Sequence, residues 1–272
     1  MSSRLSLTVL GSGGPIASPR RVSAGYVLSI DGKPRLLVDA GGGSFERLGR
    51  SGLDISSLEQ ILLTHLHIDH TSDLPAVVMD LYVGDRKRPI AITGPTGRPG
   101  NNAAPENASP QPGMREFVRL LFGLRGAWRY MNTFEGFGIT VRDTSVYAVA
   151  VPHGMMPSVA FRVDCGAESV VFSGDISAST ASFIALAKNC SMLVHDFALP
   201  EGDVPNGKLH AKPSAVGYTA QQSATKRLLL SHLMPPIESE LAQSLTIVRS
   251  EYDGPIEVAS DLKAYEIGAQ RS

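Results

Sequence analysis

The sequence predicts an α/β fold in which apolar strands carry metal-binding side chains to one edge of a sheet. The first observation is the run Thr64-His65-Leu66-His67-Ile68-Asp69-His70, which directly follows the apolar stretch Ile61-Leu62-Leu63. The second is that other apolar stretches also end near a metal-ligand residue type, namely His153, Asp175 and His232. Open α/β sheets place their chemistry at such strand ends.

In the first part of the chain, the apolar pattern predicts three strands and a helix before the histidine-rich run. They are expected at Ser6 to Leu10, Gly25 to Ile30, Arg35 to Val38 and, for the helix, Ser44 to Arg50. After the run, Asp73 is placed to cap a helix that has Pro75 in its first turn and continues to Leu81. Such a helix would fix the exit of the chain from the run.

The second part of the chain repeats this plan weakly. Apolar strands are expected at Val146 to Val151, Val170 to Phe172 and Leu228 to Ser231. Ile61 to Leu66 and Leu228 to Leu233 share three apolar residues, a hydroxyl residue, a histidine and a leucine. The repeat suggests two related αβ halves that face each other and both contribute ligands.

The residue types of the histidine-rich run point to metal binding. His65 and His67 alternate and can project to one side of an extended backbone, whereas Asp69 and His70 lie where the chain must turn into a helix. Imidazole and carboxylate are ligands of first-row transition metals, and zinc uses them most often. The alternative is a polar turn with incidental histidines, but so many ligand groups are costly to gather without a cation.

The length and composition agree with one large domain, residues 1–272. The chain has 272 residues of which 43% are hydrophobic, which is enough for a full core. Its formal net charge is −1, so it lacks the excess of positive charge that would indicate nucleic-acid binding. Its beginning, Met1 to Leu7, lacks an apolar signal core, and no stretch is suited to a bilayer, which predicts a cytoplasmic protein. Cys165 and Cys190 are expected to be reduced structural thiols.

Residues 93–137 are expected to form a loop or lid insertion. From Thr93 to about Pro112 the chain is rich in Gly, Pro and Asn, and an amphipathic helix is expected from Met114 to Phe122. Large side chains follow at Trp128, Tyr130, Met131, Phe134 and Phe137. They either wall a substrate pocket over the metal cleft or form a minor core under a surface loop.

The motifs together resemble the metallo-β-lactamase-fold hydrolases. The His-x-His-x-Asp-His signature at His65 to His70 is complete, and the Ser173-Gly174-Asp175 turn also matches. The resemblance implies an αββα four-layer sandwich. It looks closest to the branch of ribonuclease Z, arylsulfatase-like enzymes and phosphodiesterases, because Val194-His195-Asp196-Phe197-Ala198 and Leu209-His210-Ala211-Lys212-Pro213-Ser214 resemble that branch's elements. The chain departs from the branch in having Asp196 in place of Glu, and Lys212.

The resemblance implies a binuclear metal site of two Zn²⁺, with Mn²⁺ or Fe as alternatives. The implied ligands are His65, His67 and His153 for the first ion, Asp69, His70 and His232 for the second, and Asp175 as a bridge. A hydroxide bound by both ions would be the nucleophile. The implied catalytic residues are Asp69, His210 and Asp196. His210, oriented by Asp196, would protonate a leaving group or clamp the substrate, unless it is a surface histidine beside Lys212. His195 and Asp39 are expected to support the site or to be structural.

The resulting prediction is a metal-dependent hydrolase of phosphoric or sulfuric esters acting on a small molecule. The alternative is a ribonuclease Z-type tRNA 3′-processing endonuclease; a lactonase and a non-catalytic binding protein are further alternatives. All seven implied ligands are intact, which argues against the last. A nucleic-acid partner is possible but not favoured, because Arg115, Arg119, Arg125 and Arg129 form only a short basic stretch. No membrane partner is expected, and a homodimer stays open.

Overall fold

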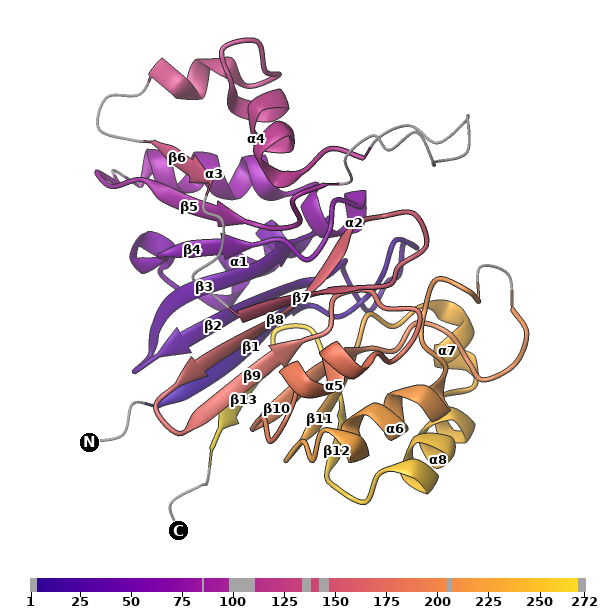
Figure 1. Ribbon diagram of the computed structural model, residues 1–272. Coiled ribbons are helices and arrows are strands. Elements are labelled where there is room, and N and C mark those ends of the chain that lie inside the picture. Colours follow the sequence, from indigo (N-terminus) through magenta and orange to yellow (C-terminus); the bar gives the residue numbers. More distant parts are fainter. Residues whose placement is uncertain are drawn as a thin grey trace, which may run out of the picture.

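The fold consists of two β-sheets that lie face to face, with helices on the outer face of each (Figure 1). The computed structural model describes residues 4–84, 86–97, 111–133, 138–141, 147–204 and 207–268. From one side to the other the layers are helix, sheet, sheet and helix. The predicted αββα sandwich is therefore confirmed.

The elements follow one another in an α/β order. The strands are β1 (Leu5–Gly11), β2 (Gly25–Ile30), β3 (Lys33–Ala40), β4 (Gln60–Leu62), β5 (Ile90–Thr93), β6 (Ile139–Val141), β7 (Tyr147–Val151), β8 (Ser158–Cys165), β9 (Glu168–Phe172), β10 (Met192–Asp196), β11 (Leu228–Ser231), β12 (Ile256–Val258) and β13 (Ala264–Ile267). The α-helices are α1 (Ser44–Ser51), α2 (Ile68–Thr71), α3 (Leu74–Val83), α4 (Met114–Phe122), α5 (Ala181–Leu186), α6 (Pro213–Gln222), α7 (Pro235–Ser239) and α8 (Leu241–Glu251). Two 3₁₀ turns are η1 (Ile55–Ser57) and η2 (Arg129–Thr133).

Strand pairing explains how distant parts of the chain reach one edge. The first sheet has the order β13-β1-β2-β3-β4-β5-β6 and the second has the order β12-β11-β10-β9-β8-β7. Strands β3 to β6 are parallel, and so are β9 to β12. Because the carboxyl ends of parallel strands meet at the same edge, the turns after β3, β4, β9, β10 and β11 can converge.

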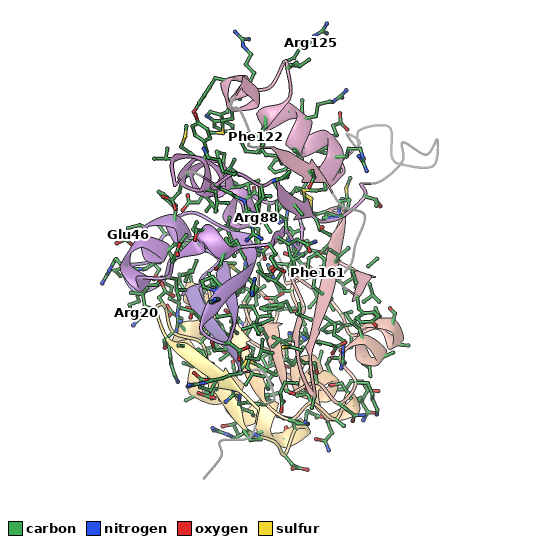
Figure 2. All side chains as sticks on the ribbon, turned by 90° about the vertical axis from the view of Figure 1, so that its left-hand side faces the viewer. Arg20, Glu46, Arg88, Phe122, Arg125 and Phe161 are labelled. Carbon is green, nitrogen blue, oxygen red and sulfur yellow. The ribbon has the colours of Figure 1, made fainter. Side chains whose placement is uncertain are left out.

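Alternation along the buried strands builds three apolar layers. In β4, Ile61 faces the helices of the first half, whereas its neighbour Leu62 faces the other sheet. In β11, Leu229 faces the other sheet, and the residues on either side of it face α6 and α8. Phe161 lies in the layer between the sheets (Figure 2). Strands covered on both faces are apolar throughout, which is why these stretches lack a two-residue polar pattern.

The first three strands and α1 occur where the sequence predicts them, and the expected cap at Asp73 is wrong. Asp73 precedes α3, but its side chain makes no capping hydrogen bond there. Its carboxylate instead accepts hydrogen bonds from the backbone N–H groups of Gly43 and Phe45, at 2.8 and 2.9 Å, and so caps the start of α1. The sequence could not reveal this, because the turn after β3 and the end of the histidine-rich run meet only in the fold.

The expected insertion is described only in part. Residues 98–110, Phe134 and Phe137 lie outside the described residues, as does Val146 at the start of a predicted strand. Helix α4 forms as predicted and packs on the outer side of the first sheet. Trp128 packs beside the buried Phe122, with the two ring centroids 6.2 Å apart. Trp128 therefore fits the alternative in which these side chains form a minor core. The role of residues 93–137 as a lid stays a prediction.

Both cysteines are free, as expected: Cys190 is buried and Cys165 is partly exposed. Among the described helices, none combines the length and the apolar character that crossing a membrane requires.

We expect Trp128→Ala to lower the free energy of unfolding by roughly 2–3 kcal/mol, because it removes a large side chain that packs on the first core. Urea unfolding followed by circular dichroism measures this. Leu124→Ala is the control from the same segment: Leu124 is 87% exposed, and its loss should change stability by less than about 0.5 kcal/mol. A Trp128→Ala protein of unchanged stability but altered substrate preference would favour the lid instead.

Candidate metal centre

The shared edge of the two sheets gathers all seven residues that the sequence singled out as metal ligands. Those from the first half follow β4 and enter α2, and those from the second half follow β7, β9 and β11. The seven are His65, His67, Asp69, His70, His153, Asp175 and His232. Their convergence was expected, and their role as ligands stays a prediction.

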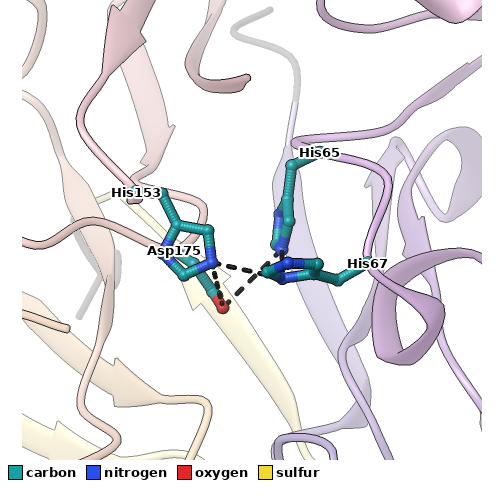
Figure 3. A group of neighbouring side chains, drawn as sticks. All are labelled: His65, His67, His153 and Asp175. Carbon is teal, nitrogen blue, oxygen red and sulfur yellow. Dashed lines mark hydrogen bonds and ion pairs between the residues drawn. The ribbon is translucent and has the colours of Figure 1, made fainter. Parts of the chain in front are cut away.

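Three imidazole nitrogens and a carboxylate form the first group (Figure 3). The Nδ1 atom of His67 lies 2.9 Å from Nε2 of His65 and 3.2 Å from Nε2 of His153. Asp175 Oδ2 lies 3.7 Å from the first of these Nε2 atoms and 3.6 Å from the second. The candidate ligand atoms of these four residues all lie within 4.8 Å of one another.

The second group lies on the other side of Asp175. Asp69 Oδ2 is 3.6 Å from Nε2 of His70 and 3.2 Å from Nε2 of His232. Asp175 reaches the same two imidazoles, with Oδ1 at 3.4 Å from His70 and Oδ2 at 3.4 Å from His232. Asp175 therefore contacts both groups, which is the position required of a bridging carboxylate.

The donor set fits a pair of cations. The Nδ1–H of His153 donates to the carbonyl oxygen of Leu209 at 2.9 Å, so its Nε2 presents a lone pair to the first group. In the second group, Nε2 of His70 is buried and has no hydrogen-bond partner among the described residues. Lone pairs directed at one another in a buried place are unfavourable unless a proton or a cation lies between them.

The electrostatics of the first group favour neutral, metal-binding imidazoles. Burial, together with neighbouring histidines, holds the pKa of His65 well below its usual value, and burial with His153 lowers the pKa of His67. In the second group, burial opposes the charge of His70, but Asp175 and Asp39 outweigh it and raise the pKa. The two groups thus differ in the number of nearby carboxylates. The first contains Asp175 alone, whereas the second contains Asp175 and Asp69 and is also contacted by Asp39.

Asp39 and Thr64 contact two of the predicted ligands on the side away from the centre. Asp39 Oδ2 accepts from Nδ1–H of His70 at 2.9 Å, and its Oδ1 accepts from the backbone N–H of Thr64 at 2.8 Å. The hydroxyl of Thr64 also lies 3.1 Å from Nδ1 of His65. Asp39 was expected to support the site, whereas Thr64 was missed. One sequence signal could have identified Thr64. In the similar stretches Ile61 to Leu66 and Leu228 to Leu233, Thr64 and Ser231 each directly precede a histidine that is a predicted ligand.

The turn that carries Asp175 requires glycine. Gly174 has a φ of +58°, and a Cβ placed there would lie 2.8 Å from Cβ of Thr64. A side chain at this position would therefore be strained and would also push the two sheets apart at the metal centre. Glycine lets the end of β9 approach the end of β4.

His210 and Asp196 lie beside the second group. His210 Nδ1–H donates to Asp196 Oδ2 at 2.8 Å, and the His210 ring stacks near His232 with centroids 5.3 Å apart. His210 is only 8% exposed, so the surface-histidine alternative does not describe it. Burial lowers the pKa of His210, but the negative charge of Asp196 outweighs burial and raises it to about 9.

His195 points away from the ligands. Its Nδ1–H donates to the backbone carbonyl of Asp196 at 2.8 Å, and its ring lies edge-on to Phe183. This agrees with the expected packing role.

Comparisons with known proteins agree with the resemblance inferred from the motifs. The family model described as the Metallo-beta-lactamase superfamily matches residues 18–213. Ribonuclease Z of Mycobacterium avium (strain 104) is 27% identical over 289 aligned residues, which cover 97% of this chain and 99% of the relative.

Two solved structures are similar over almost the whole chain. The metallo-beta-lactamase fold protein YhfI from Bacillus subtilis superposes with a TM-score of 0.74 at 19% identity, covering 97% of this chain and 99% of the other. The short form of human tRNase Z gives a TM-score of 0.72 at 22% identity, covering 97% and 100%. At these identities the likeness concerns the fold.

We expect the purified protein to bind two transition-metal ions per chain, because seven ligand side chains exceed what one tetrahedral zinc ion can use. Elemental analysis and native mass spectrometry measure the stoichiometry. Asp175→Ala should reduce it more than the loss of His67, because Asp175 contacts both groups. A metal-saturated chain that holds at most one ion would contradict the binuclear site.

We expect Asp39→Asn to weaken metal binding by roughly 10- to 100-fold without abolishing it, because Asp39 orients His70 rather than facing the centre. Competition with a chromophoric chelator measures the affinity. The matched control is Asp54→Asn, whose carboxylate caps the distant η1 turn and should leave metal affinity unchanged. An Asp39→Asn protein with the affinity of the wild type would assign Asp39 a role in folding only.

Proposed function

The chain belongs to the metallo-beta-lactamase superfamily, and from this premise we propose that it is a metal-dependent phosphodiesterase whose reaction is of the ribonuclease Z type. The observation that carries the proposal is the seven-residue cluster, buried except for the partly exposed His67, with the His210–Asp196 pair beside it. Such a site can activate water, stabilise charge on a phosphoryl group and protonate a leaving oxygen.

The relatives change the order of the functions that the sequence left open. The main expectation was a small-molecule phosphoric or sulfuric ester, with tRNA 3′ processing as the alternative. Similarity to ribonuclease Z over nearly the full length of both proteins supports that alternative better. We therefore propose RNA as the favoured substrate.

The residues divide the work as follows. His65, His67, His153 and Asp175 would hold one cation, and Asp69, His70 and His232, with Asp175, the other. Bound there, Zn²⁺ ions would supply Lewis acidity and lower the pKa of water. The side chain of His210 is fixed at Nδ1 by Asp196, so Nε2 is the atom left to give a proton to the departing oxygen of the substrate.

A small-molecule phosphodiester is the second candidate, and the charge of the chain favours it. The formal net charge is −1, and nucleic-acid binding rests largely on neutralising phosphates. The short basic stretch from Arg115 to Arg129 begins in α4 and includes Arg125. Arg125 lies at an outer end of the molecule (Figure 2).

Cleavage of a precursor tRNA and of small esters by one metal-analysed preparation distinguishes these candidates. We expect cleavage at the 3′ side of the precursor tRNA, and weaker turnover of bis-nitrophenyl phosphate. Nitrophenyl sulfate, a homoserine lactone and nitrocefin test the other reactions of the fold. Turnover of small phosphodiesters without tRNA cleavage would favour the second candidate, and no turnover of any ester by metal-loaded protein would leave a binding protein.

We expect His210→Ala to keep both metals and to cut turnover by roughly 10²- to 10⁴-fold on phosphodiesters with poor leaving groups. Nitrophenyl esters should lose much less, because nitrophenolate departs without a proton. Steady-state kinetics on one alkyl and one nitrophenyl phosphodiester measure the difference. An equal loss on both esters would make His210 a substrate clamp.

The pH profile provides a second measurement of the same role. With a pKa raised to about 9, His210 carries its proton below that pH and loses it as the pH rises through it. Because bound cations repel the imidazolium, the loss should occur at lower pH in the metal-loaded protein. The alkaline decline should therefore be present for the alkyl ester, and absent for the nitrophenyl ester and for His210→Ala.

A further inference from the structure

Asp196 faces two histidines, of which only one is hydrogen-bonded to it. Its Oδ2 accepts from His210 Nδ1–H at 2.8 Å and from the backbone N–H of Ile176 at 3.2 Å. Its Oδ1 faces Nδ1 of His232 at 3.6 Å, which is beyond a good hydrogen bond. One carboxylate at the end of β10 thus lies between the candidate acid and a candidate metal ligand.

The two atoms on the unbonded side are both buried without a partner. Asp196 Oδ1 and His232 Nδ1 have no hydrogen bond to any described residue, and both side chains are about 3% exposed or less. His232 Nε2 faces Asp69 and Asp175, on the side of the candidate metal position. With a cation bound at Nε2, the proton of the neutral ring would lie on Nδ1, which faces Asp196. Leaving a carboxylate oxygen and an imidazole nitrogen unpaired in the interior is unfavourable, because each group loses the hydrogen bonds that water would provide.

A small cavity lies against the same residues. Its volume is about 20 Å³, and Asp196, His232, Ser231 and Tyr26 are among the residues that line it. A single water molecule needs roughly 10–15 Å³ of such space and two to four polar partners. The cavity therefore has the size and the polarity for one water.

The far wall of the cavity is fixed by a contact between the sheets. The hydroxyl groups of Tyr26, from β2, and Ser231, from β11, are 2.7 Å apart and hydrogen-bonded. Both groups are buried, so this contact holds the two sheets in register next to the metal centre.

We propose that this cavity binds one water molecule that accepts from His232 Nδ1–H and donates to Asp196 Oδ1. Asp196 then positions both His210, directly, and His232, through the water. The half of this inference that concerns His210 rests on the proposed function, whereas the half that concerns His232 rests on metal binding alone. Asp196 is accordingly a positioning residue for the metal centre as well as for the acid.

Metal affinity, measured without substrate, separates this role from support of His210 alone. Competition with a chelator measures the affinity for each of the two ions. Asp196→Asn should weaken the binding of the ion that depends on His232 by roughly 10- to 100-fold. His210→Ala should leave both affinities unchanged, because it removes the imidazole but keeps the carboxylate. Ser29→Ala is the control, since Ser29 Oγ is another buried atom without a partner, on β2 and outside the metal centre.

Unchanged metal affinity in a folded Asp196→Asn protein would overturn the inference. A crystal structure of the metal-loaded wild type tests it without any variant. It should contain a water within about 3.2 Å of both Asp196 Oδ1 and His232 Nδ1. An empty cavity, or direct contact between the two side chains, would also overturn it. Because neither measurement uses a substrate, failure of the phosphodiesterase proposal would be seen separately, in the ester and tRNA assays.

Discussion

The structure depends on the burial of many ionisable side chains at one edge between two sheets. Asp39, Asp69, Asp175 and Asp196 are all buried there together with five buried imidazoles, those of His65, His70, His153, His210 and His232. Charged groups are stable in such a place only when each is paired, hydrogen-bonded or bound to a cation. The apolar layers beside this edge lower the effective dielectric constant around it, which strengthens the electrostatic interactions among these side chains.

The backbone accepts strain at the points where these side chains are delivered. Asp39 and His232 both have a positive φ, +56° and +60°, although neither is glycine. Left-handed conformations of this kind cost about 1–2 kcal/mol for each residue, and they persist where the surroundings fix them. At Asp39 the hydrogen bonds to Thr64 and His70 supply that fixation. Of the six non-glycine residues with a positive φ in the described part of the chain, these two belong to the candidate centre: a predicted ligand and the carboxylate that orients another.

The sequence predicts the parts of this site that are local and cannot predict the parts that are made by the fold. The spacing from His65 to His70 and the apolar stretches before His153, Asp175 and His232 are local patterns, and they were enough to identify the fold. The cap that Asp73 provides to α1, and the contact of Tyr26 with Ser231, join residues from different elements. Single aspartate, tyrosine and serine residues occur at many other positions of the chain, so nothing in the sequence distinguishes these three.

The division of the site between the two sheets links metal binding to the packing of the whole molecule. His65, His67, Asp69 and His70 come from the first half, and His153, Asp175 and His232 come from the second. Because a cation held by both halves binds only when the halves are docked, its binding free energy contributes to the stability of the sheet-to-sheet contact. Tyr26 and Ser231 make that contact next to the centre, and Gly174 allows β9 to approach β4 there. The layer between the sheets therefore supports the candidate site, because a shift of one sheet against the other would separate the predicted ligands of the two halves.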